Sequence, residues 1–247
     1  MNSLYSACGL KWNIVHWAKS RLYRHKLGIG ASRLEELVAQ CGAKPWHLGA
    51  IKRRQERRHV CIAGYWLAEY APRDISIFEP GCGSGANLLW LASRGFHNVS
   101  GADIDGAALE LCRALQKELG RHFPVFEDDC MQPRHPAERQ DVILSVNWLY
   151  HIPNASLGGF LEKYLPSLKD NGVLICDIID DAYNKVKNNQ YHTQDAAKPE
   201  HERRPSEYTF RMSRRDVAET ASQHGLHILH EAVAYAVPQR KVYMLAR

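Results

Sequence analysis

The stretch FEPGCGSGANLLWLASRG, residues 78–95, decides the fold of this chain. The apolar run ISIF leads into it, glycines follow at positions 81, 83 and 85, and an apolar, helix-like segment begins directly after them. Glycines between a strand and a helix let the backbone turn sharply and approach a ligand closely. With Ala86 the spacing also fits a loose dinucleotide-binding pattern. The stretch therefore predicts a strand, a ligand-binding loop and a helix.

From residue 75 onward, short apolar strands alternate with amphipathic helices. This alternation is typical of βαβ units, which build a parallel sheet covered by helices on both faces. The end of the chain differs, because the two strands that follow a helix at 212–225 are joined only by PQR, residues 238–240. That link is too short for a crossover helix. We therefore predict an α/β fold in which an antiparallel hairpin closes one sheet edge.

Length and composition favour one globular unit with an added segment. The chain has 247 residues, of which 45% are hydrophobic and 24% charged, as is usual for a globular protein with one sizeable core. Charged residues interrupt the first 26 positions before an apolar run reaches the length of a signal peptide or membrane span. The seven cysteines are scattered, so we interpret them as buried free thiols and predict no metal site. We expect a cytoplasmic protein.

The N-terminal part of the chain is basic. Residues 1–74 hold 13 Lys or Arg against 5 Asp or Glu, a balance of +8, whereas the whole chain carries +5. The run IKRRQERRH, residues 51–59, either binds an anionic partner or forms a solvated helix face, and we favour the helix face. We predict that residues 1–74 form a helical cap on the substrate side of a domain spanning 75–247. Trp46 and His47 are candidates for one wall of an acceptor pocket.

Acidic residues end three of the predicted strands or follow them. Glu79 precedes the glycine loop, Asp103 ends the second strand, and Asp129 ends the third. Asp103 lies 22 residues past Gly81, where a carboxylate accepts hydrogen bonds from a ribose diol. The Glu79 carboxylate would repel a pyrophosphate but attract a positively charged amino-acid tail. A ligand with ribose, adenine and such a tail is S-adenosylmethionine, and we predict it as the cofactor.

Five segments in chain order match motifs of one family: FEPGCGSG (78–85), VSGADID (99–105), EDDC (127–130), DVILSVNWLYHIP (141–153) and LEKYLPSLKDNGVLIC (161–176). Together they resemble the class I S-adenosylmethionine-dependent methyltransferases, from about Ile75 to the C-terminus. Asp170 and Asn171 replace a proline and a glycine of the family pattern, in what we expect to be a turn away from the cofactor. The resemblance implies a Rossmann-like, doubly wound, seven-stranded sheet, mostly parallel, with an antiparallel C-terminal hairpin.

The resemblance also implies which residues bind the cofactor. Asp129 is expected on the adenine amino group, with the adjacent Asp128 as the alternative contact. The full set of expected cofactor-binding residues is Glu79, Gly81, Cys82, Gly83, Gly85, Asp103, Ile104, Asp128, Asp129, Cys130 and Asn147.

Methyl transfer from a sulfonium is an in-line displacement, so positioning of the acceptor and exclusion of water supply much of the rate. A hydroxyl acceptor also needs a base. His151 is a candidate base or adenosyl contact, or else a half-buried histidine bonded to backbone; Tyr150 is a second catalytic candidate. The segment 183–212 is expected to be an excursion over the active site. Residues expected to line the acceptor pocket, or to pack at its rim, are Trp148, Tyr191, His192 and Tyr208.

The acceptor itself is not encoded in any motif. We expect a small molecule or a sugar, methylated on oxygen or nitrogen, because the chain lacks a separate macromolecule-binding domain. The sequence after Asn147 is not the N-P-P-[YFW] signature of DNA amino-group methylation. An RNA or protein acceptor is the alternative, favoured by the basic N-terminal segment, although nucleic acid is not expected. A non-catalytic S-adenosylmethionine-binding protein is a third possibility.

Overall fold

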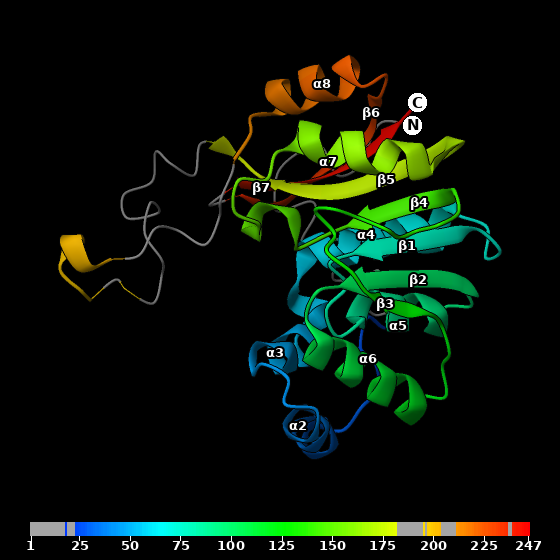
Figure 1. The fold of residues 1–247 in the computed structure, drawn as a ribbon, viewed down its shortest axis with the longest axis vertical. Helices are drawn as coiled ribbons and strands as arrows, with labels where there is room; N and C mark the ends of the chain where they lie inside the picture. Colours follow the sequence, from blue (N-terminus) through cyan, green and yellow to red (C-terminus); the bar gives the residue numbers. More distant parts are fainter. Residues whose placement is uncertain (1–17, 19–22, 182–194, 196, 204–210, 237–238) are drawn as a thin grey trace.

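The computed structural model describes residue 18, residues 23–181, 195, 197–203, 211–236 and 239–247. These residues form a seven-stranded sheet with the strand order β3-β2-β1-β4-β5-β7-β6 (Figure 1). The strands are β1 (Ser76–Pro80), β2 (Asn98–Asp103), β3 (Val125–Glu127), β4 (Gln140–Ser145), β5 (Leu168–Ile179), β6 (His227–Ala236) and β7 (Gln239–Ala246).

The pairing of the strands confirms the predicted topology. Strands β1 to β5 pair in parallel, and β7 runs antiparallel to both β5 and β6. Strand order reverses between β1 and β4, and in open α/β sheets the ligand crevice lies at this switch point, outside the carboxyl ends of the strands. The predicted doubly wound, mostly parallel sheet with a C-terminal antiparallel hairpin is therefore confirmed.

Helices cover both faces of the sheet (Figure 1). One hydrophobic cluster joins the sheet to α2 (Ala31–Gln40), α4 (Arg58–Tyr70), α5 (Ala86–Ser93) and α6 (Gly106–Glu118). A second cluster joins the opposite face to α7 (Leu157–Tyr164) and α8 (Arg214–Gln223). The N-terminal helices α2 and α4 thus share the core of the sheet. Burial of apolar side chains holds them there.

Local sequence explains where several helices begin. Ser213 caps α8 in a capping box with Asp216, as its position before the helix predicted. Asp105 caps α6 by accepting a hydrogen bond from the amide of Ala108.

Of the cysteines within the described residues, Cys41 is half-buried and five more are buried, all of them free.

The structure corrects the sequence analysis at two places. Asp170 and Asn171 lie within β5, where the pairing with β4 shifts register, and not in a turn. The basic run 51–59 is not one solvated helix face, because α3 (Trp46–Lys52) ends within it, the 3-10 turn η1 (Arg54–Glu56) follows, and α4 begins at Arg58. This break turns the Arg54 side chain inward, so that only 2% of the residue is exposed.

Candidate active site

The loop after β1 has the backbone that only glycine adopts readily. Gly81, Gly83 and Gly85 all have positive φ, at 66°, 53° and 69°. A Cβ on Gly81 would lie 2.1 Å from Cδ1 of Trp148, and one on Gly85 would lie 2.3 Å from Sγ of Cys112. A Cβ on Gly83 would meet only His47, at 3.4 Å, and Trp46, at 3.7 Å. Gly81 and Gly85 therefore sit against packed side chains, whereas Gly83 faces the N-terminal segment across a small gap.

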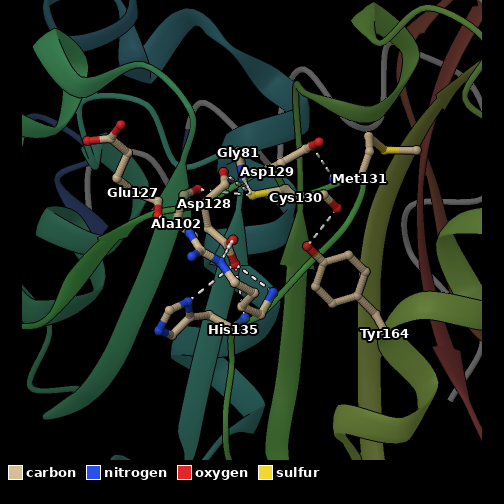
Figure 2. Close-up of polar contacts among 10 residues, drawn as sticks. Gly81, Ala102, Glu127, Asp128, Asp129, Cys130, Met131, His135 and Tyr164 are labelled. Atoms are coloured by element: carbon tan, nitrogen blue, oxygen red, sulfur yellow. Dashed lines mark hydrogen bonds and ion pairs between the residues drawn. The ribbon is translucent and has the colours of Figure 1, made fainter.

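Side chains from neighbouring strands pin this loop. Asp103 Oδ2 accepts a hydrogen bond from the Gly83 amide at 2.7 Å, and its Oδ1 accepts one from the Asp105 amide at 2.9 Å. The Gly81 amide donates to Sγ of Cys130 at 3.3 Å, a contact drawn in Figure 2. Burial raises the pKa of Asp103 above its usual value, while its bonds to the backbone amides act against the rise. Asp103 thus fixes the backbone of the loop from the end of β2.

Glu79, at the end of β1, is buried and only half satisfied. Its Oε1 accepts from Nδ2 of Asn87 at 2.5 Å, but its buried Oε2 has no hydrogen-bond partner among the described residues. Burial raises the pKa of Glu79 to about 8, against the lowering effects of Asn87 and of the nearby Arg54 charge. A buried carboxylate with an unused oxygen is costly, and a cationic ligand group bonded to Oε2 would remove that cost.

The two neighbouring aspartates after β3 have different surroundings (Figure 2). Asp128 is buried and accepts hydrogen bonds from the Arg134 and His135 amides at 2.9 and 3.0 Å and from Nε of Arg134 at 3.0 Å. These bonds hold the loop 128–135 in place and occupy both carboxylate oxygens of Asp128. Asp129 is half-buried and accepts one bond, from the Met131 amide at 2.9 Å. Of the two expected adenine contacts, Asp129 is therefore the one whose carboxylate can accept further hydrogen bonds.

Asn147, after β4, is held in a left-handed backbone conformation with φ of 67°. Its amide donates to Oδ1 of Asp177 at 2.7 Å, and its Oδ1 accepts from Arg240 at 3.1 Å and from the Tyr150 hydroxyl at 3.2 Å. Because a guanidinium only donates, Arg240 fixes which end of the Asn147 amide is oxygen. The side-chain NH2 of Asn147 takes no part in these hydrogen bonds.

Tyr150 belongs to that network and not to an open site. The residue is fully buried, and its hydroxyl bonds Arg240 and Asn147. Arg240 in turn forms an ion pair with Asp177. The catalytic role expected for Tyr150 is therefore at odds with its position, because a hydroxyl committed to a buried network cannot meet an acceptor. His151 is half-buried beside the Tyr150 ring, at 4.5 Å between centroids.

The remaining acceptor candidates divide into described and undescribed residues. Trp148 is partly buried, and its indole lies against Gly81 and packs edge-on against Phe160 with the ring centroids 6.1 Å apart. Tyr191, His192 and Tyr208 lie outside the described residues, as does most of the segment 183–212. Ile104, expected on the cofactor, is 70% exposed directly after Asp103.

A cavity of about 70 Å³ opens above the glycine loop. Glu79, the loop and Asn147 form one wall, and the N-terminal segment forms the other. Sequence reasoning missed Arg54, Arg57 and Asn87 as lining residues; the basic run 51–59 was the only signal for the two arginines. The N-terminal lining residues are Trp46, Ala50, Arg54, Arg57 and Val60.

Trp46 and His47, expected at an acceptor pocket, stack on each other with ring centroids 3.7 Å apart. Trp46 is 54% exposed, whereas His47 is fully buried and both its ring nitrogens lack hydrogen-bond partners. Burial lowers the pKa of His47 to about 4. The pair therefore places a neutral, largely apolar surface opposite Gly83.

The described residues contain no helix long and apolar enough to cross a membrane. Nor do they contain a group of three or more His, Cys, Asp or Glu side chains that could hold a metal ion.

Comparison with known proteins finds matches to part of the chain. Residues 77–172 match the family model described as a methyltransferase domain. Ribosomal protein L11 methyltransferase of Caldanaerobacter subterraneus subsp. tengcongensis is 26% identical over 134 residues, which cover 53% of this chain and 40% of that protein. The match thus spans less than half the length of this curated relative.

Solved structures share the fold. Magnesium protoporphyrin IX methyltransferase from Synechocystis PCC 6803 with bound SAH superposes with a TM-score of 0.60 at 17% identity, covering 78% of this chain and 83% of that one. A putative methyltransferase of Haloferax volcanii, in complex with the Trm112 activator, gives 0.61 at 16% identity, covering 85% and 97%.

Proposed function

We propose that this chain, a class I S-adenosylmethionine-dependent methyltransferase, methylates a small molecule or sugar in the cytoplasm. The observation that carries the proposal is the buried, unpaired Oε2 of Glu79 at a cavity on the glycine loop. A carboxylate in that position suits a cationic group and disfavours a phosphate. S-adenosylmethionine is the cofactor of this family, and when bound it supplies a methyl group on a positively charged sulfur.

In this proposal different residues bind different parts of the cofactor. Glu79 binds the amino group of its amino-acid tail. Asp103, already oriented by the Gly83 and Asp105 amides, accepts from the ribose hydroxyls. Asp129 accepts from the adenine amino group, and the exposed side chain of Ile104 covers the adenine ring. Gly83, which has no side chain, allows the backbone close approach.

The acceptor side is built from the N-terminal segment and the loop after β4. Trp46 and His47 supply an apolar surface above the glycine loop, which would exclude water from the reacting groups. His151 stays the candidate base, because Tyr150 is committed to Arg240 and Asn147. A small acceptor is also favoured because the Synechocystis structure that shares the fold is a methyltransferase of a small molecule, magnesium protoporphyrin IX.

An RNA or protein acceptor is the second candidate. The curated relative is named for a ribosomal protein, and the basic run exposes Lys52 and Arg53 to solvent. The first observation rests on a partial match and the second on surface charge alone. We therefore rank a macromolecular acceptor below a small one. A non-catalytic binding protein is the third candidate.

Calorimetry followed by a transfer assay tests the proposal. We expect the purified chain to bind S-adenosylhomocysteine, and a screen with methyl-labelled cofactor to give transfer to hydroxylated metabolites or sugars. Labelling of RNA or of ribosomal protein instead would favour the second candidate. Cofactor binding with no transfer to any acceptor class would favour the third, and absence of binding would overturn the cofactor assignment.

A further inference from the structure

The arginines of the basic run occupy different environments. Arg53 is exposed and lies outside the cavity lining. Arg54 and Arg57 both line the cavity that Glu79 also lines. Arg57 is half-buried and stands directly before α4, where η1 ends. The break between these two helical elements therefore brings both arginines to the cavity lining.

Arg54 already has neutral partners. Its guanidinium donates to Oδ1 of Asn87 at 3.3 Å, contacts Nδ1 of His25 at 3.1 Å, and lies 4.6 Å from the centroid of the Trp90 ring. Since Asn87 in turn donates to Glu79, Arg54 is linked to Glu79 through Asn87.

Arg57 is different, because the described residues give its guanidinium no hydrogen bond and no ion pair. Burial lowers its pKa, as expected for a cation without a counter-ion. The other ionisable groups near it include Arg53, Arg54, Arg240 and Tyr235, and none of these carries negative charge near neutral pH. His47 and His59 nearby are kept neutral by burial, which lowers the pKa of both. Partial burial of an arginine without a partner is energetically costly unless a ligand anion pairs with its guanidinium.

The cavity thus holds an unpaired carboxylate oxygen on one wall and an unpaired guanidinium on the other. Such a pair is complementary to a zwitterion, with an ammonium at Glu79 and a carboxylate at the arginine. Asn147 also lines this cavity, and its side-chain oxygen is held by Arg240. We propose that Arg57 binds the carboxylate of the cofactor's amino-acid tail, an inference that rests on the proposed function. The N-terminal segment would then complete the cofactor site as well as the acceptor wall.

The test compares three ligands that differ only in the tail. S-adenosylhomocysteine has both charges, its decarboxylated analogue keeps the amine alone, and methylthioadenosine has neither. Calorimetric dissociation constants are measured for the unmodified chain, for Arg57→Met, and for Arg53→Met as the matched exposed control. Arg57→Gln serves as a second variant, and thermal unfolding verifies that each variant is folded.

We expect Arg57→Met to weaken S-adenosylhomocysteine binding by about tenfold or more, as for loss of a charged hydrogen-bond pair. Binding of the decarboxylated analogue and of methylthioadenosine should stay within about twofold. Arg53→Met should leave all three constants unchanged.

Equal weakening of all three ligands, or no weakening of any, in folded Arg57 variants would overturn the inference. These outcomes leave the proposed function intact, because the unmodified chain still binds. If the unmodified chain fails to bind S-adenosylhomocysteine, the proposed function falls first and the inference with it.

Discussion

The two walls of the cavity are made in different ways. The wall after β1 is backbone: its glycines have positive φ, and its amides are pinned by Asp103 and Cys130. The wall from the N-terminal segment is side chain: Trp46, Arg54 and Arg57 reach the cavity from helices held by apolar packing elsewhere. A backbone wall tolerates few residue types at each position, whereas a side-chain wall can change chemistry without changing the fold.

Gly85→Ala should damage the backbone wall most. Its new Cβ would lie 2.3 Å from Cys112 Sγ at φ of 69°, so we expect a loss of about 2–5 kcal/mol in unfolding free energy from strain and overpacking. Gly83→Ala is the matched control: its Cβ meets nothing closer than 3.4 Å, and we expect about 1–2 kcal/mol from φ alone. Urea unfolding measures both, and equal losses would show that packing around Gly85 relaxes freely.

Glu79→Gln should change how stability depends on pH. In the unfolded chain this carboxyl titrates near 4.5, but in the folded chain without cofactor it titrates at about 8. Between these values the folded chain holds the extra proton, so stability falls as pH rises, by up to about 1.4 kcal/mol per pH unit. The glutamine variant lacks this loss and should gain stability over the unmodified chain as pH increases.

Urea unfolding at several pH values from about 5 to 8 measures that difference, with the exposed Glu127→Gln as control. Curves for Glu79→Gln and the unmodified chain that run parallel across this range would show that Glu79 ionises normally.

Asp103→Ala should weaken binding of S-adenosylhomocysteine by about 1–3 kcal/mol, because the ribose loses a charged acceptor and the Gly83 amide loses its anchor. Titration calorimetry measures the change. Asp128→Ala differs in kind, because Asp128 bonds only its own loop; it should lower stability more than affinity. Unchanged affinity in a folded Asp103 variant would remove Asp103 from the ribose site.

Lys44→Met should have the smallest effect. Lys44 is 66% exposed and pairs with Asp105 at 2.8 Å, linking the N-terminal segment to the loop after β2. Exposed pairs of this kind contribute about 0–1 kcal/mol, so we expect less than about 1 kcal/mol in unfolding free energy, shrinking further in high salt. A larger loss would mean that this surface contact, and not the apolar core, holds the side-chain wall in place.

Sequence patterns predicted the sheet well because its constraints are local. Alternating apolar strands and helices required parallel pairing, and the short PQR link required the terminal hairpin, both of which the strand order confirms. The cofactor assignments for Glu79, Asp103 and Asp129 remain predictions. Glu79 lies one residue before the end of β1, Asp103 ends β2, and Asp129 lies two residues past the end of β3. The expected catalytic role of Tyr150 does not fit its position, because the local sequence gives no sign that its hydroxyl bonds to Arg240, 90 residues away.

By itself the sequence determined the glycine loop, the order of strands and helices, and the acid that closes each of the first strands. These features depend on backbone geometry and on hydrophobic period, which neighbouring residues fix. Only the tertiary structure decided that the Asp128 carboxylate bonds to its own loop, that Tyr150 is buried, and that Arg54 and Arg57 line the same cavity as Glu79. Those outcomes depend on which distant groups meet in the folded chain, because burial and hydrogen-bond partners, not residue type, decide what a polar side chain is free to do.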